Sequence, residues 1–190
     1  MTYAAAGRAA SRSSSVHPRR LLPLGLALAA LSACAHAPRL AAPPIAVGAQ
    51  PRFDALRFFS GRSEGTGRLS KAFSRTVPTW VESEGQVVAG VLRLRQVVHE
   101  GGKPVRSREW AIREDRPGHY SGTLTDAAGA VTGESVGNRL HLAFRLKKSA
   151  LPVEQWLTLS PDGKRAYNVL KVRKLGLTVA VLSEDIRRLD

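Results

Sequence analysis

Alternation of apolar and polar side chains with a period of two is the feature that most constrains this fold. It is clearest over residues 139–147, where the apolar positions are Leu140, Leu142, Phe144 and Leu146. Successive side chains of a β-strand point to opposite faces, so this pattern predicts a strand with one buried and one solvated face. Shorter stretches of the same pattern occur at residues 92–95, 109–113 and 157–159.

Turn sequences separate these runs at short intervals. They are Glu84-Gly85, Glu100-Gly101-Gly102, Arg116-Pro117-Gly118, Ala128-Gly129, Gly137-Asn138 and Asp162-Gly163. Antiparallel strands need only such tight connections, whereas parallel strands need long crossovers. We therefore predict an all-β fold, an antiparallel meander of about eight to ten strands that is closed or nearly closed as a barrel, because closure removes exposed sheet edges. A short N-terminal helix or turn with Phe53, Leu56 and Phe59 on one face is expected to plug one end of it.

The first 33 residues have the features of a secretory signal. A pair of arginines, Arg19-Arg20, precedes an apolar run over residues 21–33. As a helix this run would be about 20 Å long, too short for a hydrocarbon core of about 30 Å. A basic region, a short apolar region and small residues before a cut define a signal peptide. The ending Leu31-Ser32-Ala33-Cys34 resembles the bacterial lipobox, in which the signal peptidase recognises Leu31, Ser32 and Ala33 and the cysteine is lipidated.

These features divide the chain into three parts. Residues 1–33 are expected to be a lipoprotein signal peptide, and residues 34–51 the lipidated Cys34 with a flexible tether rich in Ala and Pro. Residues 52–190 are expected to form the β-barrel domain. Lipid on Cys34 would attach the protein to a membrane of the cell envelope, and Ala35 after it favours the outer membrane, facing the periplasm. An ordinary signal peptide that contains a cysteine is the alternative, and the start codon is left open between Met1 and Val16.

Several short motifs between about Phe58 and Val181 resemble, in order and spacing, a proteobacterial lipoprotein family of unknown function. They are Phe59-Ser60-Gly61, Gly65-Thr66-Gly67, Trp110, Tyr120-Ser121-Gly122, Gly137-Asn138-Arg139-Leu140 and Lys174-Leu175-Gly176-Leu177. The resemblance implies a calycin-like barrel similar to that of the lipocalins. The chain departs from the family at Glu154-Gln155-Trp156, where acidic residues tend to stand directly before the Trp, and at Val169, where the family tends to have Arg.

No set of side chains in the sequence predicts catalysis or metal binding. The segment Gly61-Arg62-Ser63-Glu64-Gly65 matches the nucleophile-elbow pattern, but an elbow needs a strand before the Ser and a helix after it. An alternating β run follows here instead. The five His are scattered, and the single Cys excludes a multi-cysteine metal site. We therefore expect a protein that is not an enzyme and that carries no cofactor and no metal.

Two functions remain open for the barrel. The large apolar side chains that would line a ligand cavity, or else fill the core, are Trp80, Trp110, Leu142, Phe144 and Trp156. A cavity would make the protein a binding module for a lipid or other apolar small molecule of the membrane. A filled core would favour a structural or assembly lipoprotein that contacts another envelope protein. Without residues 1–33, which hold four of the 29 basic residues and no acid, the chain has 25 basic and 15 acidic residues. This net charge of +10 favours anionic surfaces, although a protein that simply uses Arg freely is the alternative. Export to the envelope excludes nucleic acid as a partner.

Overall fold

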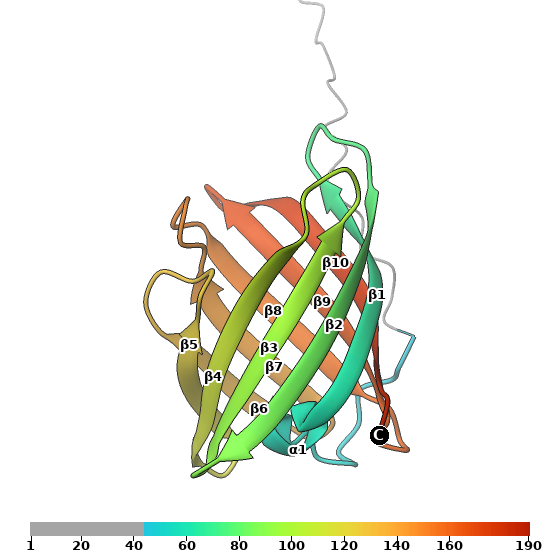
Figure 1. Cartoon of the computed structure of the whole chain (residues 1–190), viewed down its shortest axis with the longest axis vertical. Coiled ribbons are helices and arrows are strands. Elements are labelled where there is room, and N and C mark those ends of the chain that lie inside the picture. Colours follow the sequence, from blue (N-terminus) through green and yellow to red (C-terminus); the bar gives the residue numbers. More distant parts are fainter. Residues whose placement is uncertain (1–43) are drawn as a thin grey trace, which may run out of the picture. The chain divides into compact units, whose positions relative to one another are not determined.

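A closed antiparallel barrel of ten strands and one short helix makes up residues 44–190, the part of the chain that the computed structural model describes (Figure 1). Consecutive strands pair in order, and β1 closes the barrel by pairing with both β2 and β10. The elements are α1 (Ala55–Phe59), β1 (Gly61–Lys71), β2 (Val77–Val88), β3 (Val91–Glu100), β4 (Arg106–Arg116), β5 (His119–Leu124), β6 (Val131–Val136), β7 (Arg139–Arg145), β8 (Pro152–Leu159), β9 (Arg165–Lys174) and β10 (Leu177–Arg188). The predicted all-β meander and its closure are confirmed.

Alternation along each strand separates the barrel interior from its outer surface. In β7, Leu140, Leu142 and Phe144 are buried, while Arg139 and Arg145 are exposed. The inward side chains of the other strands join them in one apolar core. Because a shift of one residue would turn this whole apolar face outward, burial of the core fixes the strand register.

The turn predicted at Glu84-Gly85 is wrong, because both residues lie within β2. The chain turns instead at Ala89-Gly90, where both residues have positive φ, 51° and 75°. Gly85 is needed for packing: a Cβ there would lie 3.0 Å from the carbonyl carbon of Phe59, the last residue of α1. This glycine therefore seats the helix against the sheet.

The helix α1 closes one end of the barrel, beside β2, β3 and β4 (Figure 1). Asp54 caps it by accepting a hydrogen bond of 3.0 Å from the backbone N–H of Arg57. Phe58 and Phe59 are buried, and Phe53 just before the helix is fully enclosed. This confirms the expected N-terminal helix. Within residues 44–190, no helix has the length and apolar character needed to span a bilayer.

Part of the predicted tether is fixed to the barrel at the same end. Gly48 donates its N–H to Oδ1 of Asn138 at 2.7 Å, and the Asn138 side chain donates to the carbonyl of Ala46 at 3.0 Å. The barrel domain therefore begins at least six residues before the predicted boundary at position 52, because these backbone groups find partners in the β6–β7 turn. The lipobox, Cys34 and the tether up to residue 43 lie outside the described residues.

Candidate ligand site inside the barrel

The first component of the interior site is an inward-facing polar cluster on β2, β3 and β4. Gln96 of β3 is 7% exposed and accepts hydrogen bonds of 2.8 Å from Arg108 Nε and from Trp110 Nε1. Its own amide donates to Ser83 Oγ at 2.9 Å. Gln96 thus fixes the Arg108 side chain through Nε. The terminal amino groups of the guanidinium make no hydrogen bond within residues 44–190.

A buried carboxylate on β10 is the second component. Glu184 is 5% exposed, and its Oε2 accepts a hydrogen bond of 2.9 Å from the amide of Asn168 on β9. Burial raises the pKa of Glu184, an effect that the Asn168 hydrogen bond and the charge of Arg108 partly offset. Burial also lowers the pKa of Arg108, which nevertheless remains charged at neutral pH. No ion pair within residues 44–190 joins these two charges directly.

Four further polar atoms on the interior side of the barrel lack hydrogen-bond partners. They belong to residues that are at most 8% exposed, and none has a partner within residues 44–190; the atoms are Ser63 Oγ, Thr79 Oγ1, Gln155 Oε1 and Asn168 Oδ1. Buried polar atoms in native proteins are nearly always paired with protein or ordered water. The amide oxygens accept hydrogen bonds, and the hydroxyls both donate and accept. The interior therefore offers unused polar capacity in addition to its two charges.

A small cavity in the barrel interior is lined by both Arg108 and Glu184. It has a volume of about 40 Å³. The rest of its wall is mainly apolar, with Ala55, Phe59, Leu92, Leu94, Gln96, Trp110, Ile112, Leu140, Leu142, Gln155 and Ile186. A cavity of this size has room for a few water molecules at most. Polar groups at one part of an apolar wall are typical of a small-molecule site.

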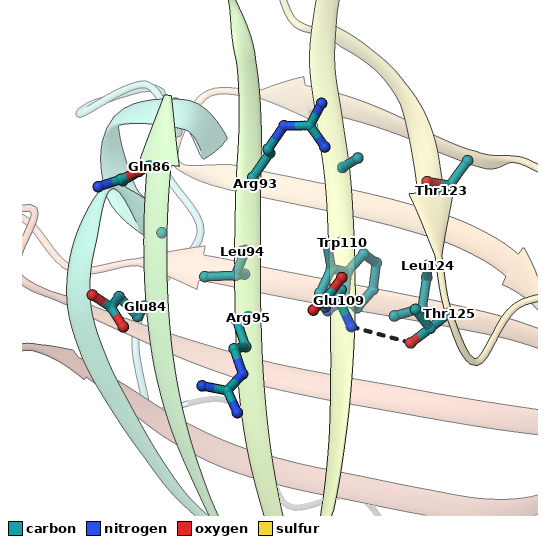
Figure 2. A pocket seen from close by; sticks show the side chains of 12 residues that line it. Glu84, Gln86, Arg93, Leu94, Arg95, Glu109, Trp110, Thr123, Leu124 and Thr125 are labelled. Atoms are coloured by element: carbon teal, nitrogen blue, oxygen red, sulfur yellow. Dashed lines mark hydrogen bonds between the residues drawn. The ribbon is translucent and has the colours of Figure 1, made fainter. Parts of the chain in front are cut away.

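A hollow of about 550 Å³ lies on the outer wall of the barrel and is open to solvent. Figure 2 shows Arg95 of β3 between Glu84 of β2 and Glu109 of β4, three residues that are aligned in register across the strands. The backbone N–H of Glu109 donates to Thr125 Oγ1 at 3.1 Å. Opposite charges that lie side by side on a solvated sheet neutralise one another. This surface therefore favours neither an anionic nor a cationic ligand.

Three of the five residues predicted to line a cavity face the interior. Trp110 and Leu142 line the cavity, and Phe144 packs in the core, edge-on to Trp110 at 5.7 Å between ring centroids. The inward position of Trp110 follows from its place between Arg108 and Ile112 on the same face of β4.

Trp80 and Trp156 correct the prediction, because they lie on the outer wall. Trp80 is 39% exposed and stacks on His99 at 4.6 Å, and Trp156 stacks on His141 at 4.7 Å. Each pair consists of directly opposed residues on neighbouring strands, where ring stacking shields the tryptophan from water. Trp80 directly precedes the buried Val81 in β2. Because successive side chains of a strand point to opposite faces, Trp80 points outward.

Sequence reasoning missed Gln96, Arg108, Asn168 and Glu184. Three of them share the strand period of core residues: Gln96 follows Leu94, Arg108 precedes Trp110, and Glu184 precedes Ile186, each by two positions. A polar residue in the inward series of a strand is the signal that marks such a site. The nucleophile-elbow segment contains no elbow, since Ser63 lies within β1.

These features define a lipocalin-like barrel with a polar site in its interior. Three solved structures share the fold. Rv2717c from M. tuberculosis matches with a TM-score of 0.55 and 18% identity over 72% of this chain and 96% of that one. The S-type phycobiliprotein lyase from Guillardia theta matches with a TM-score of 0.54 and 7% identity over 71% of this chain and 90% of that one. A DUF3598 protein of unknown function from Nostoc punctiforme matches with a TM-score of 0.50 and 9% identity over 74% of this chain and 51% of that one.

The chain belongs to the DUF3833 family, described as a protein of unknown function, whose model matches residues 29–188. A comparison with curated proteins finds no match. The likeness to the solved structures shows the fold alone, because the identities are low. Any function must therefore be argued from the site itself.

Proposed function

We propose that this protein is a ligand-binding lipoprotein of the bacterial envelope, whose barrel interior binds an amphipathic molecule with an anionic group. Lipid on Cys34, the cysteine of the predicted lipobox, anchors it, with the barrel facing the periplasm from the outer membrane. The proposal assigns the barrel no catalytic role. The bilayer that holds the anchor is then also the source of amphipathic ligand.

The observation that carries this proposal is the pair of charged side chains on the cavity wall, Arg108 and Glu184. Enclosing a charged group costs free energy unless hydrogen bonds and opposite charge compensate for the loss of water. Glu184 is buried, and its compensation is incomplete because four interior polar atoms have no partner within residues 44–190; Arg108, which is partly buried, is fixed there through Nε alone. A barrel that served only as a scaffold would be more stable with apolar side chains at these positions.

The chemistry of the wall defines the ligand class. The free amino groups of Arg108 suit a carboxylate, sulfonate or phosphate, which a guanidinium binds with two parallel hydrogen bonds. Ligand donors would pair with the unpartnered amide oxygens of Gln155 and Asn168. The apolar part of the ligand would pack on Leu92, Ile112 and similar side chains of the wall.

Binding requires the interior to open. The cavity of about 40 Å³ is well below the several hundred Å³ of a typical small-molecule site. Arg108 has the longest side chain on the wall, and within residues 44–190 only its Nε forms a hydrogen bond with a neighbour. Its movement toward a ligand group would widen the cavity without breaking the sheet.

Titration with the anionic apolar dye anilinonaphthalene sulfonate tests this function. Residues 35–190 contain the complete barrel and its core, so they are suited to the experiment without the lipid anchor. Arg108→Met should weaken dye binding by about 10–100-fold, the equivalent of a lost hydrogen bond to a charged group. Arg113→Met is the matched control, because Arg113 lies on the same strand but is exposed and paired with Asp115. Equal dye affinity in both variants would contradict an interior site at Arg108.

The size of the cavity favours a second function. A nearly filled core is what a structural or assembly lipoprotein that contacts another envelope protein needs. In that case Arg108 and Glu184 would serve only to fix the register of the strands that carry them. A folded domain that binds no dye would support this function in place of ligand binding.

A further inference from the structure

Hairpin connections form the end of the barrel opposite α1 (Figure 1). Large apolar side chains are exposed at the tips of these hairpins. Phe73, in the β1–β2 connection, is 97% exposed, and Leu175, in the β9–β10 turn, is 93% exposed. Leu177 and Val105 at the same end are 72% and 57% exposed. These four residues are called the apolar tips below. Full exposure of Phe and Leu at loop tips is unfavourable in water.

The hairpins that carry the apolar tips are neighbours. Strand β1 pairs with β10 up to Lys71 and Ala180, and the pairing continues with a hydrogen bond of 2.9 Å from Ala72 N–H to the Val179 carbonyl. This places the β1–β2 connection beside the β9–β10 turn. The β3–β4 connection follows on the other side, where Gly101 N–H donates to the Pro78 carbonyl at 3.0 Å. The apolar tips therefore occupy three adjacent loops of one rim.

Backbone conformation at two tips supports a specific role. Phe73 has φ of 60° and Leu175 has φ of 50°, in the left-handed region where side chains with a Cβ are disfavoured. Strained positions of this kind are concentrated at functional sites. Glycine would relieve both the strain and the exposure, yet each turn presents a large apolar side chain instead.

The charges around the apolar tips are predominantly positive. Arg75, Lys147, Lys148 and Lys174 are exposed at this rim, and none forms an ion pair within residues 44–190. The acidic side chains at this end are already paired: Glu100 contacts Lys71 at 2.6 Å and Lys103 at 2.8 Å, and Asp126 pairs with Arg106. The rim thus combines protruding apolar tips with uncompensated cations.

We propose that this rim docks on the surface of an anionic lipid bilayer. Apolar side chains enter the region between headgroups and acyl chains, while lysine and arginine bind lipid phosphates. Separate protruding tips suit a soft headgroup layer better than the flat surface of a folded partner. A second copy of the chain is a poor occupant, because contact between two rims would bring their uncompensated cations together. The inference does not depend on the interior ligand site.

Vesicle cosedimentation of residues 35–190 tests the docking surface, since without Cys34 no acyl group anchors the protein. The vesicles contain phosphatidylcholine alone or phosphatidylcholine mixed with phosphatidylglycerol. The double variant Phe73→Ser/Leu175→Ser should weaken binding to the anionic vesicles by about tenfold or more, because it removes two inserting side chains. The double variant Lys147→Glu/Lys148→Glu should also weaken binding to the anionic vesicles. It should make this binding less sensitive to salt concentration.

Matched control variants lie elsewhere on the barrel. Val88→Ser/Val136→Ser removes exposed apolar side chains at the α1 end, where Val88 is 54% and Val136 is 70% exposed. Arg93→Glu/Arg116→Glu makes the same charge change away from the rim. The controls should bind as the unmodified domain does. All variants should retain the thermal stability of the unmodified domain, since the changed side chains are exposed.

Three results would overturn the docking proposal. The first is absence of binding to anionic vesicles by the unmodified domain. The second is equal loss of binding in the rim variants and in their controls. The third is self-association of the domain, seen by sedimentation velocity and abolished by Phe73→Ser/Leu175→Ser, which would make the rim an interface between copies.

Discussion

Glu184 of β10 lies directly against Gly65 of β1: a Cβ at position 65 would stand 2.7 Å from the carboxyl carbon of Glu184. The two strands are paired in this region, with Gly65 opposite Ile186 and Gly67 opposite Glu184. The Gly65-Thr66-Gly67 motif therefore makes room for the buried carboxylate. This links a backbone motif on one strand to a polar side chain more than 100 positions away in the sequence.

Gly65→Ala is expected to destabilise the barrel by about 1–3 kcal/mol, the usual cost of forcing an extra methyl group into a packed interior. Position 65 has ordinary strand conformation, so the cost arises from the contact with Glu184. In a Glu184→Ala background the same change should cost much less. Denaturant melts of the four proteins give the coupling free energy. Additive effects would show that the two residues do not compete for space.

Glu184→Gln is expected to raise the free energy of unfolding at neutral pH, because it removes a buried charge and keeps an acceptor for Asn168. Burial raises the folded-state pKa of Glu184 above its ordinary value of 4.5. The native state therefore holds this proton more tightly than the unfolded chain. The stability linked to that proton is complete below the unfolded pKa and is lost as the pH rises through the folded pKa.

The difference in stability between Glu184→Gln and the unmodified domain should accordingly shrink as the pH falls from the folded pKa toward the unfolded value of 4.5, and should change no further below it. Denaturant melts at acidic and neutral pH measure it. A difference that is the same at every pH would contradict the raised pKa. Lower stability of the variant at neutral pH would mean that the charge of Glu184 is well compensated in the fold.

The sequence contained enough information for the sheet and for the expectation that it closes, but not for which two strands close it. The alternation over residues 139–147 predicts β7 and its buried face, because the period is a local property. Glu84-Gly85 has the composition of a turn but lies within a strand, because glycine also occurs where another backbone approaches closely, as α1 does here. The pairing of β1 with β10 joins the two ends of the barrel, and no local pattern specifies it.

The interior site was less predictable, for the same reason. The inward position of Arg108 can be derived from the period of β4, and that of Glu184 from the period of β10. Their approach across the cavity depends on the register of all ten strands. The size of Trp80 and Trp156 suggested a buried position, but stacking with cross-strand histidines shields them on the outer wall.

Truncation of Leu142 or Phe144 to Ala is expected to cost about 2–5 kcal/mol, as for other large buried side chains. Both residues are 7% exposed, whereas the neighbouring Arg145 is exposed. Arg145→Gln should change stability by no more than about 0.5 kcal/mol. Denaturant melts of the three variants rank them. A reversed ranking would place the strand one residue out of register.

Cys34 is expected to carry lipid and to become the mature N-terminus. Two or three acyl chains give stable anchoring, whereas a single chain binds only marginally. Cells that express the full chain are labelled with a fatty-acid analogue, with Cys34→Ala as the control. Label should appear in the unmodified protein alone. Equal incorporation into both proteins would contradict lipidation at Cys34.

The claim that the barrel interior binds a ligand is tested most directly by native mass spectrometry. The sample is the domain of residues 35–190, purified under mild conditions from the cells in which it is expressed. The account predicts a bound species with an anionic group and an apolar part, present with the unmodified domain and lost with Arg108→Met. The control Arg113→Met should retain it. A ligand-free mass for a well-folded unmodified domain, or a bound species that is equally abundant in Arg108→Met, would contradict an interior ligand site.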